Sequence, residues 1–359
     1  MTTRYCGPGG NDAWAGTSWA TRKLTLNGLE DSPVTAGDVC YIAPGTYRET
    51  LTCDVSGGAG SPITYIGDYD GSHTDGVGGV ARITGSDDDQ VAVRANCIAA
   101  NAKNYRTFSG LAMDTATGNV LAVVGGTDWV IQQCIVFGIA NGLAFGTTTP
   151  LTIQNCFVRA TYAGINVDGL ADATTDVISN CVILAGAVNN YQGIHSRHGG
   201  MVIRNCTILS ANRGLSADTN VGQTVTVNNC VVAFCSTGLW AAALGEMTED
   251  YNTVYGCVTA RSNVAVGANS LAYPPLFDSR WFFELVNGGR MLSPFDLASY
   301  SQLVDVAGTS PTTTDMRGTA AIGGVREWGS LEFDPTLLIE SAAGGGGAVS
   351  ISPLKGNIG

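Results

Sequence analysis

Short segments with apolar residues at nearly every second position recur through the middle of the chain. Residues 151–158 (LTIQNCFV), 201–208 (MVIRNCTI) and 225–232 (VTVNNCVV) are rich in β-branched side chains, and Gly, Asn, Asp and Thr separate them. Alternation over four to eight residues predicts a half-buried strand, and these segments carry no sustained helical period. The pattern therefore predicts an all-β chain built from short strands.

These segments also contain a repeated dipeptide, Asn-Cys, with one Gln-Cys variant. The steps between its cysteines are 37, 22, 25, 25 and 24 residues. A second series, Gly followed by Leu or Ile, has steps of 22, 29, 21 and 24 residues. A common period of about 24 residues predicts a solenoid, in which each repeat buries its apolar face against its neighbours. The first series is Asn96-Cys97, Gln133-Cys134, Asn155-Cys156, Asn180-Cys181, Asn205-Cys206 and Asn229-Cys230, and the second begins at Gly142, Gly164, Gly193, Gly214 and Gly238.

Coils of about 24 residues with two or three short strands are typical of a single-stranded parallel β-helix. Equivalent strands would stack about 4.8 Å apart, and residues 97–257 have room for about seven coils. The repeated Cys would then form an inward column of small, apolar side chains. The repeated Asn would occupy a turn, where it tolerates the left-handed region and joins its equivalents in an amide ladder.

The chain divides into four segments on this pattern. Residues 1–36 form an N-terminal strand and a capping segment, in which Thr17 or Ser18 would begin a short helix carrying Trp19, Leu24 and Leu26. Residues 37–270 form the β-helix, residues 271–339 close it, and residues 340–359 form an extended, Gly-rich C-terminal tail.

Composition limits the classes of partner. The net charge of −12 argues against a nucleic-acid surface, and 45% hydrophobic residues with 13% charged residues argue against disorder. No apolar stretch of 18 residues occurs, so membrane insertion is not expected. The N-terminus lacks the apolar core of a signal peptide, which predicts synthesis in a cytoplasm and reduced thiols.

Two clusters are candidates for chemistry. The acidic cluster Asp87, Asp88 and Asp89 offers oxygen ligands for Ca²⁺, although consecutive Asp residues are also common in solvated turns. Asp168, Asp172 and Asp176 lie in a second long turn with the same two interpretations. The basic residues come shortly after the Gly positions of the second series, so adjacent coils would bring them to one outer face. That face could supply a catalytic base and contacts to a sugar, or it could be an ordinary polar surface. This basic cluster comprises His195, Arg197, His198 and Arg213.

Several stretches resemble a known superfamily. "GNDAWAGTSWAT", "AGDVCYIAPGTYRETL", "GSPITYIGD" and "ARITGSDDD" are similar to the N-terminal part of right-handed parallel β-helix proteins of the pectate-lyase-like superfamily. "PPLFDSRWFFELVNGGRMLSPFDLAS" and "TDMRGTAAIGGVREWGSLEF" resemble the closing segment of the same group. The resemblance implies a right-handed coil, and lyases of this group use an Arg or Lys base with Ca²⁺. It does not decide the activity, because the fold hosts many functions.

Two functions remain open. In the first, the chain is a structural bacteriophage virion protein, displayed on a capsid or tail, that binds other virion proteins and contacts cell-surface glycans. It would form a homo-oligomer, by analogy a trimer, and need no cofactor. In the second, it is a polysaccharide lyase acting on an acidic polysaccharide with an Arg or His base on the lateral face, and Ca²⁺ is its expected cofactor. The arm that would anchor it in a virion contains Val349, Ile351, Pro353, Leu354 and Ile358.

Overall fold

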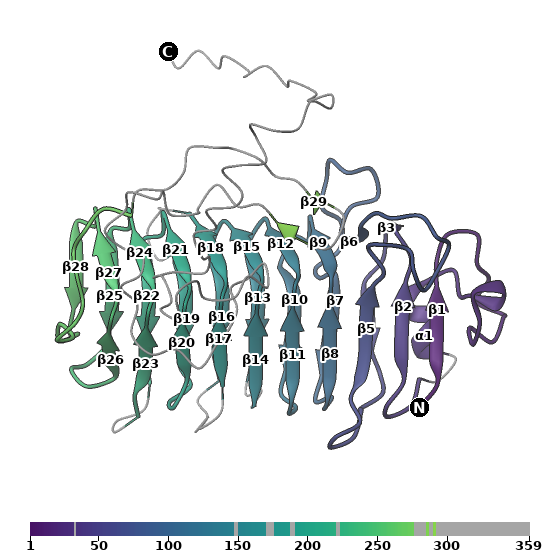
Figure 1. Ribbon diagram of the computed structural model, residues 1–359, viewed down its shortest axis with the longest axis horizontal. Helices are drawn as coiled ribbons and strands as arrows, with labels where there is room; N and C mark the ends of the chain where they lie inside the picture. The colour runs from purple at the N-terminus through teal and green to yellow at the C-terminus, as the bar shows by residue number, and fades with distance from the viewer. Residues whose placement is uncertain are drawn as a thin grey trace, which may run out of the picture.

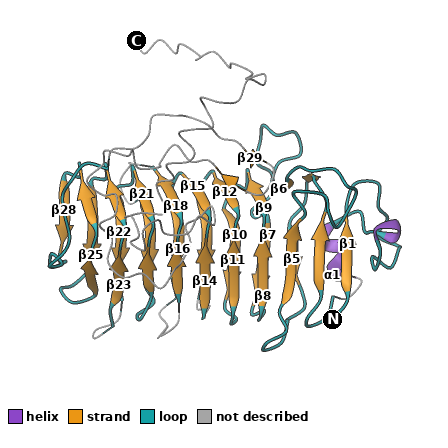
Figure 2. Ribbon diagram, viewed as in Figure 1, coloured by secondary structure: helices purple, strands orange, loops and turns teal. Residues whose placement is uncertain are grey.

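The computed structural model describes residues 1–31, 34–146, 150–169, 176–186, 191–219 and 223–275, together with the backbone of two short strands at 285–286 and 290–291. Three parallel sheets run the length of the described coils, which stack along the long axis from β1 to β28 (Figure 1). Strands dominate, and helix is almost absent (Figure 2). The predicted all-β parallel β-helix is confirmed, while the handedness of its coil stays a prediction.

Each coil contributes one strand to each sheet, in the order A, B, C. Sheet A contains β1 (Thr3–Cys6), β2 (Val39–Ile42), β5 (Ile63–Gly67), β8 (Arg106–Ser109), β11 (Trp129–Gln132), β14 (Leu151–Gln154), β17 (Val177–Ser179), β20 (Val202–Arg204), β23 (Val225–Asn228) and β26 (Met247–Asp250). Sheet B contains β3 (Gly45–Tyr47), β6 (Ala81–Thr84), β9 (Leu111–Asp114), β12 (Ile135–Gly138), β15 (Phe157–Ala160), β18 (Val182–Ala185), β21 (Thr207–Leu209), β24 (Val231–Ala233) and β27 (Thr253–Tyr255).

Sheet C contains β4 (Leu51–Cys53), β7 (Ile98–Asn101), β10 (Asn119–Val124), β13 (Asn141–Phe145), β16 (Ala163–Val167), β19 (Gln192–Ser196), β22 (Arg213–Ala217), β25 (Thr237–Ala241) and β28 (Thr259–Ser262). The described strands make nine coils, and the 21 strands from β7 to β27, which lie between Cys97 and Cys257, amount to seven coils, as the period predicts. A short antiparallel pair joins β29 (Leu285–Val286) to β30 (Arg290–Met291).

The interior is a set of apolar columns, because each inward residue pairs in register with its equivalent one coil away. The column of sheet C, for example, runs through Leu143, Ile165, Ile194, Leu215 and Leu239. Sheets A and B supply similar columns, and one continuous cluster of buried residues fills the cylinder. Burial of this apolar surface supplies the main stabilising free energy.

The repeated Cys and Asn residues lie at the corner between sheets A and B. The five thiols from Cys134 to Cys230 are fully buried. Asn155, Asn180 and Asn205 have φ between 51° and 56°, and Asn180 Nδ2 donates to Asn155 Oδ1 at 3.2 Å. Asn205 Nδ2 donates in turn to Asn180 Oδ1 at 3.3 Å. The structure therefore contains the left-handed turn and the amide ladder expected from the dipeptide.

Asn96-Cys97 is the exception, and its place in the ladder was wrongly predicted. Cys97 is buried, but it directly precedes β7 of sheet C instead of a strand of sheet B. The ladder position before Gln133-Cys134 falls in the next coil, where Gly110 joins β8 to β9 with φ 68°. Glycine adopts this conformation without the steric cost that other residues carry, so the corner needs no Asn.

The N-terminal end of the cylinder carries the predicted helix at a different position. Helix α1 spans Leu26–Asp31, and Trp19–Thr21 forms only a 3-10 turn (η1). The Thr25 hydroxyl and the Glu49 carboxylate accept hydrogen bonds from the first backbone N–H groups of α1. This capping explains why the helix begins at Leu26 and not after Ser18.

A buried ion pair ties α1 to the cylinder. Arg106 occupies an inward position on β8, and its Nη2 lies 3.0 Å from Glu30 Oε2. Tyr65 also donates to the Glu30 carboxylate, and the carbonyl of Val55 accepts from Arg106. Arg106 holds the pKa of Glu30 below its usual value, against the opposing effect of burial. The pair keeps both charges satisfied where the first coils meet the helix.

The last predicted segments fall largely outside the described residues. These include the anchoring arm with Val349, Ile351, Pro353, Leu354 and Ile358, and most of the closing segment 271–339. Neither helical segment in the described part of the chain is long and apolar enough to cross a membrane.

Candidate functional site on the outer face of sheet C

One outward-facing column on sheet C changes its residue from coil to coil. It contains Ala99, Ala122 and Ala144 in the early coils, and then Asn166, His195, Ser216, Trp240 and Ser262. The inward neighbours of these residues stay apolar throughout. We call Asn166, His195, Ser216 and Trp240, together with Arg213, the sheet C patch.

His195 is the titratable member of the patch. Its Nδ1 lies 3.0 Å from Ser216 Oγ, and that hydroxyl donates to the carbonyl of Ile194 at 3.4 Å. Because the hydroxyl proton is committed to Ile194, Nδ1 is the donor in the first bond, and Nε2 then keeps its lone pair. Burial lowers the pKa of His195, so its imidazole is neutral at neutral pH.

Arg213 and Trp240 form the second part of the patch. The guanidinium carbon of Arg213 lies 3.8 Å from the centre of the Trp240 ring, which is a cation–π contact between neighbouring strands β22 and β25. Such a contact is attractive because the ring face is electron-rich. It fixes the orientation of both side chains on the outer surface.

Arg197 lies beside the patch, just past the end of β19. It forms ion pairs with Asp168 at 3.3 Å and with Asp218 at 3.9 Å, and both carboxylates follow the equivalent strands of the neighbouring coils. These three residues give the edge of the patch a net negative charge of one. The structure thus brings His195, Arg197 and Arg213 to one face, as the sequence predicts.

His198 does not belong to this face, and its candidacy as a catalytic residue was wrong. It is completely buried, with Nδ1 2.7 Å from Asp176 Oδ2 and Nε2 3.1 Å from the carbonyl of Gly146. Asp176 also accepts from the backbone N–H of Leu151. His198 therefore links the ends of three coils and has no access to a substrate.

The acidic cluster is a network of ion pairs and turns, so the Ca²⁺ prediction for Asp87, Asp88 and Asp89 is corrected. Asp89 bridges Arg48 and Arg82, each at 2.7 Å, and Asp87 pairs with Arg94 at 2.6 Å. Hydrogen bonds from Arg48 and then from Arg82 lower the pKa of Asp89 to about 2.

Asp88 instead accepts from the backbone N–H groups of Gln90 and Val91. In the described part of the chain, no three His, Cys, Asp or Glu side chains gather as a metal site. Of the second acidic turn, Asp168 and Asp176 serve the contacts above, and Asp172 lies outside the described residues.

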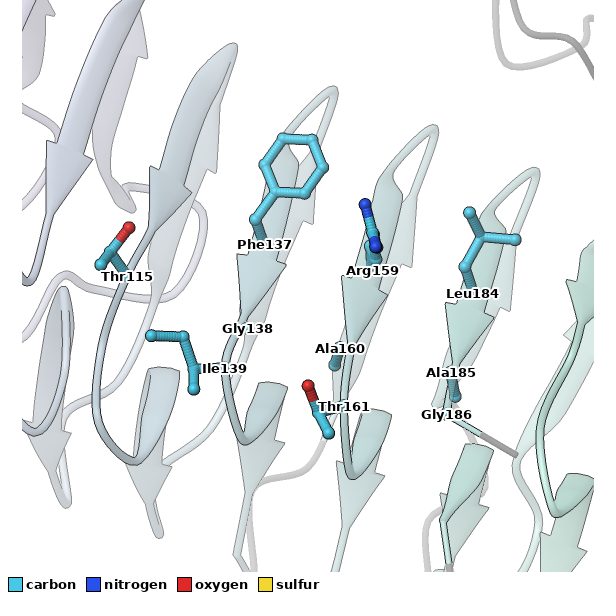
Figure 3. Close-up of a pocket in the computed structure, with 10 residues that line it drawn as sticks. All are labelled: Thr115, Phe137, Gly138, Ile139, Arg159, Ala160, Thr161, Leu184, Ala185 and Gly186. Carbon is cyan, nitrogen blue, oxygen red and sulfur yellow. The ribbon is translucent and has the colours of Figure 1, made fainter. Parts of the chain in front are cut away.

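A groove of about 450 Å³ lies on a different side of the cylinder, over sheet B. Figure 3 shows Phe137, Arg159 and Leu184 on three neighbouring strands, with Ile139 and Thr161 in the turns that follow. Among the described residues, Arg159 forms no ion pair. The groove is a second surface on which a ligand could rest, but it offers one charged group and mostly apolar walls.

Sequence reasoning missed Asn166, Ser216 and Arg159 as candidates and did not connect Trp240 with His195. A usable signal was present for the sheet C patch. Asn166, His195, Ser216 and Trp240 each stand two residues after a Gly of the second series, and this common offset places them in one outward column. Nothing in the repeat marks Arg159.

No protein-family model matches the sequence, and no curated protein matches it either. Solved structures do. The complex of XylC with xylose aligns with a TM-score of 0.61 and 13% identity, over 76% of this chain and 70% of that one. The pectate lyase Pel9A aligns with a TM-score of 0.56 and 15% identity, over 93% and 97%. At these identities the likeness concerns the fold alone, and the chain has the parallel β-helix fold of pectate lyase Pel9A and related structures.

Proposed function

We propose that this protein binds a polysaccharide along the sheet C patch. One observation carries the proposal: Asn166, His195, Ser216 and Trp240 stand in line on four consecutive coils, about 4.8 Å apart. Ser216 is only 2% exposed and holds His195, so the partly exposed Asn166 amide, His195 imidazole and Trp240 indole offer the hydrogen bonds and one apolar face along a single direction. A linear sugar polymer presents the matching pattern of hydroxyl groups and apolar ring faces.

The contacts within the patch support this proposal. Arg213 and Trp240 hold each other in place, and Ser216 holds His195, so little side-chain freedom would be lost on binding. Two solved structures of the same fold bear names that concern carbohydrates, a xylose complex and a pectate lyase. They supply a precedent for sugar ligands on this architecture.

A polysaccharide lyase is the second candidate, and the state of His195 favours it. A neutral imidazole with a free Nε2 is a general base at neutral pH. In a β-elimination this nitrogen would remove the proton next to the sugar carboxylate, the linkage C–O bond would break, a C=C bond would form, and the leaving oxygen would take a proton from water. Arg213, one coil away, would neutralise the carboxylate.

The proposal is tested with a panel of neutral and acidic polysaccharides. Binding is measured by isothermal calorimetry, and lyase activity by the ultraviolet absorbance of unsaturated chain ends. Trp240→Ala should weaken binding at least tenfold, whereas Thr226→Ala, an outward change on sheet A of the same coil, should leave it unchanged. Arg159→Ala tests the sheet B groove separately.

The outcomes separate the alternatives. If Trp240→Ala loses binding and no product appears, the chain is a binding module. If wild type releases unsaturated product and His195→Gln does not, it is a lyase with His195 as its base. Binding that survives Trp240→Ala but is lost in Arg159→Ala would move the site to the groove. No binding to any polysaccharide would overturn the proposal.

The role in a virion stays a prediction. Its anchoring arm lies outside the described residues, and it requires partners that only an assembly experiment can reveal. Removal of residues 341–359 should abolish incorporation into particles while the β-helix still folds. A truncated protein that still decorates particles would contradict this role.

A further inference from the structure

Two cysteines stand apart from the buried column at the A–B corner. Cys235 and Cys257 each lie two residues past a strand of sheet B, after β24 and β27, at the corner that leads to sheet C. The residue before each one is in the left-handed region, with φ 58° at Phe234 and 63° at Gly256. The equivalent position of the preceding coil is Ala211, so these two thiols form an isolated pair.

Their stacking satisfies the main distance requirement of a disulfide. Ala233 and Tyr255 are direct partners in sheet B, so Cys235 and Cys257 occupy equivalent positions on successive coils. Equivalent Cα atoms in a parallel sheet lie about 4.8 Å apart, inside the range of about 4.4–6.8 Å seen for disulfides. Both thiols also point the same way.

The neighbouring glycines show this shared direction. Cys235 Sγ lies 3.2 Å from where a Cβ would stand at Gly214, and Cys257 Sγ lies 3.3 Å from the same point at Gly238. Closing the bond then needs rotation of the two side chains and a small shift of the last coil. Among the described residues β27 is the terminal strand of sheet B, and its outer edge bonds to the single segment that contains Leu271 and Tyr273, so the shift would disturb few contacts.

Access and acidity distinguish the two thiols. Cys257 is half-buried, while Cys235 is only 2% exposed. The Cys235 thiol lowers the pKa of Cys257 to about 7, with a further contribution from Arg261. A thiolate is therefore populated at neutral pH on the more exposed of the two cysteines.

We infer that Cys235 and Cys257 are a redox modification site, which a small-molecule disulfide oxidises to a bond between the last two described coils. The Cys257 thiolate attacks one sulfur of that disulfide and displaces a thiolate, which leaves a mixed disulfide on Cys257. Cys235 then loses its proton, attacks Cys257 Sγ and displaces the second thiolate. The protein loses two electrons and two protons, and the oxidant is reduced to two thiols.

The bond would lock a functional coil. Trp240 lies on β25, which begins two residues after Cys235, and β27 and β28 belong to the next described coil. Closing the 22-residue loop would resist separation of these two coils, because each coil of a solenoid depends on its neighbours. This inference does not depend on what the sheet C patch binds.

The column at the A–B corner provides an internal control. Cys206 and Cys230 stack in the same way on successive coils, but both are fully buried. Each donates to the carbonyl two residues before it, as Cys235 and Cys257 also do, so exposure is the difference between the pairs. Stacking alone therefore predicts reaction at both pairs, whereas stacking with access predicts it only at Cys235–Cys257.

The folded, full-length protein is treated with oxidised glutathione at neutral pH and digested after alkylation of the remaining thiols. The expected wild-type product has lost two hydrogens, and its only linked peptides carry Cys235 and Cys257. Cys235→Ser should instead retain one glutathione on Cys257, and Cys257→Ser should gain nothing. The oxidised protein should also unfold at a higher temperature than the reduced one.

Three results would overturn the inference. They are a wild-type protein whose thiols all remain alkylatable, a disulfide that maps to Cys206–Cys230, and glutathione that persists on wild-type Cys257 without closure. The linked peptides of the wild-type protein alone distinguish these results, so the test does not require either variant to fold.

Discussion

Two columns of stacked residues show opposite behaviour along the same cylinder. At the A–B corner the chain repeats Asn and Cys through coil after coil, each in the same conformation. On the outer face of sheet C, the equivalent position changes from Ala144 to Asn166, His195, Ser216 and Trp240. The first column is uniform and its thiols are fully buried, whereas the second is varied and, apart from the buried Ser216, partly exposed.

The difference separates what stacking requires from what it permits. An inward or corner side chain touches its equivalents above and below, so a residue that fits once fits in every coil. An outward side chain meets solvent, and the fold does not dictate its identity. Variation confined to consecutive coils therefore points to a use other than folding, and the same contrast separates the buried thiols from Cys257.

The largest effect on stability is expected at the buried ion pair of Glu30 and Arg106, where charged side chains interrupt the apolar interior. Glu30→Ala should lower the free energy of unfolding by about 3–5 kcal/mol, because it leaves a buried guanidinium without its partner. Urea titration measures the change. The double variant Glu30→Leu/Arg106→Met should recover much of the loss, and a single variant as stable as wild type would show that the pair does not hold α1 to the cylinder.

A second test adds one methyl group to the uniform Gly series. At Gly193 a Cβ would stand 2.4 Å from Ile208 Cγ2 and 2.5 Å from the carbonyl of Gly214. Gly193→Ala should therefore cost about 1–3 kcal/mol through overpacking. Gly146→Ala is the matched control, because a Cβ there would stand 3.6 Å from its nearest neighbours. Its midpoint of thermal unfolding should be close to that of wild type. Equal losses in both variants would mean that close packing is not the cause.

The amide ladder should contribute less. Asn180→Ala places alanine, which tolerates the left-handed region poorly, at φ 53°, and it removes the hydrogen bonds to Asn155 and Asn205. We therefore expect the free energy of unfolding to fall by about 1–2 kcal/mol. Asn180→Gly keeps the conformation and removes only the ladder. Chemical unfolding of the two variants separates these contributions, and an Ala variant no worse than the Gly variant would exclude strain at this corner.

The smallest effect on stability is expected on the outer face of sheet C, where His195 changes its protonation state with pH. Burial holds its pKa in the folded state below the ordinary value of about 6.5, so the unfolded chain binds more protons between those two values. The stability that this group contributes is complete above about pH 6.5 and falls as the pH drops through the folded pKa. Urea midpoints of wild type and His195→Gln, compared from neutral to mildly acidic pH, should converge as the pH falls. A constant difference would contradict this prediction.

The sequence by itself determined the repeat and hence the fold. Asn155, Asn180 and Asn205 predicted a corner in the left-handed region, and the buried cysteines predicted an inward column, because stacking energy acts between neighbouring coils and so appears as a period. The same reasoning failed at Asn96-Cys97, where an identical dipeptide precedes a strand of a different sheet, and Gly110 makes the A–B corner of the next coil.

Only the tertiary structure decided which polar residues meet. His195 and His198 are three residues apart, yet one lies on the outer face and the other is buried against Asp176 and Gly146. Asp87 and Asp89 appeared free in the sequence, but arginines from separate strands and turns neutralise them. These contacts depend on loops of unequal length and on the coil above or below. No single period records them, because they bring together residues whose spacing along the chain differs from one contact to the next.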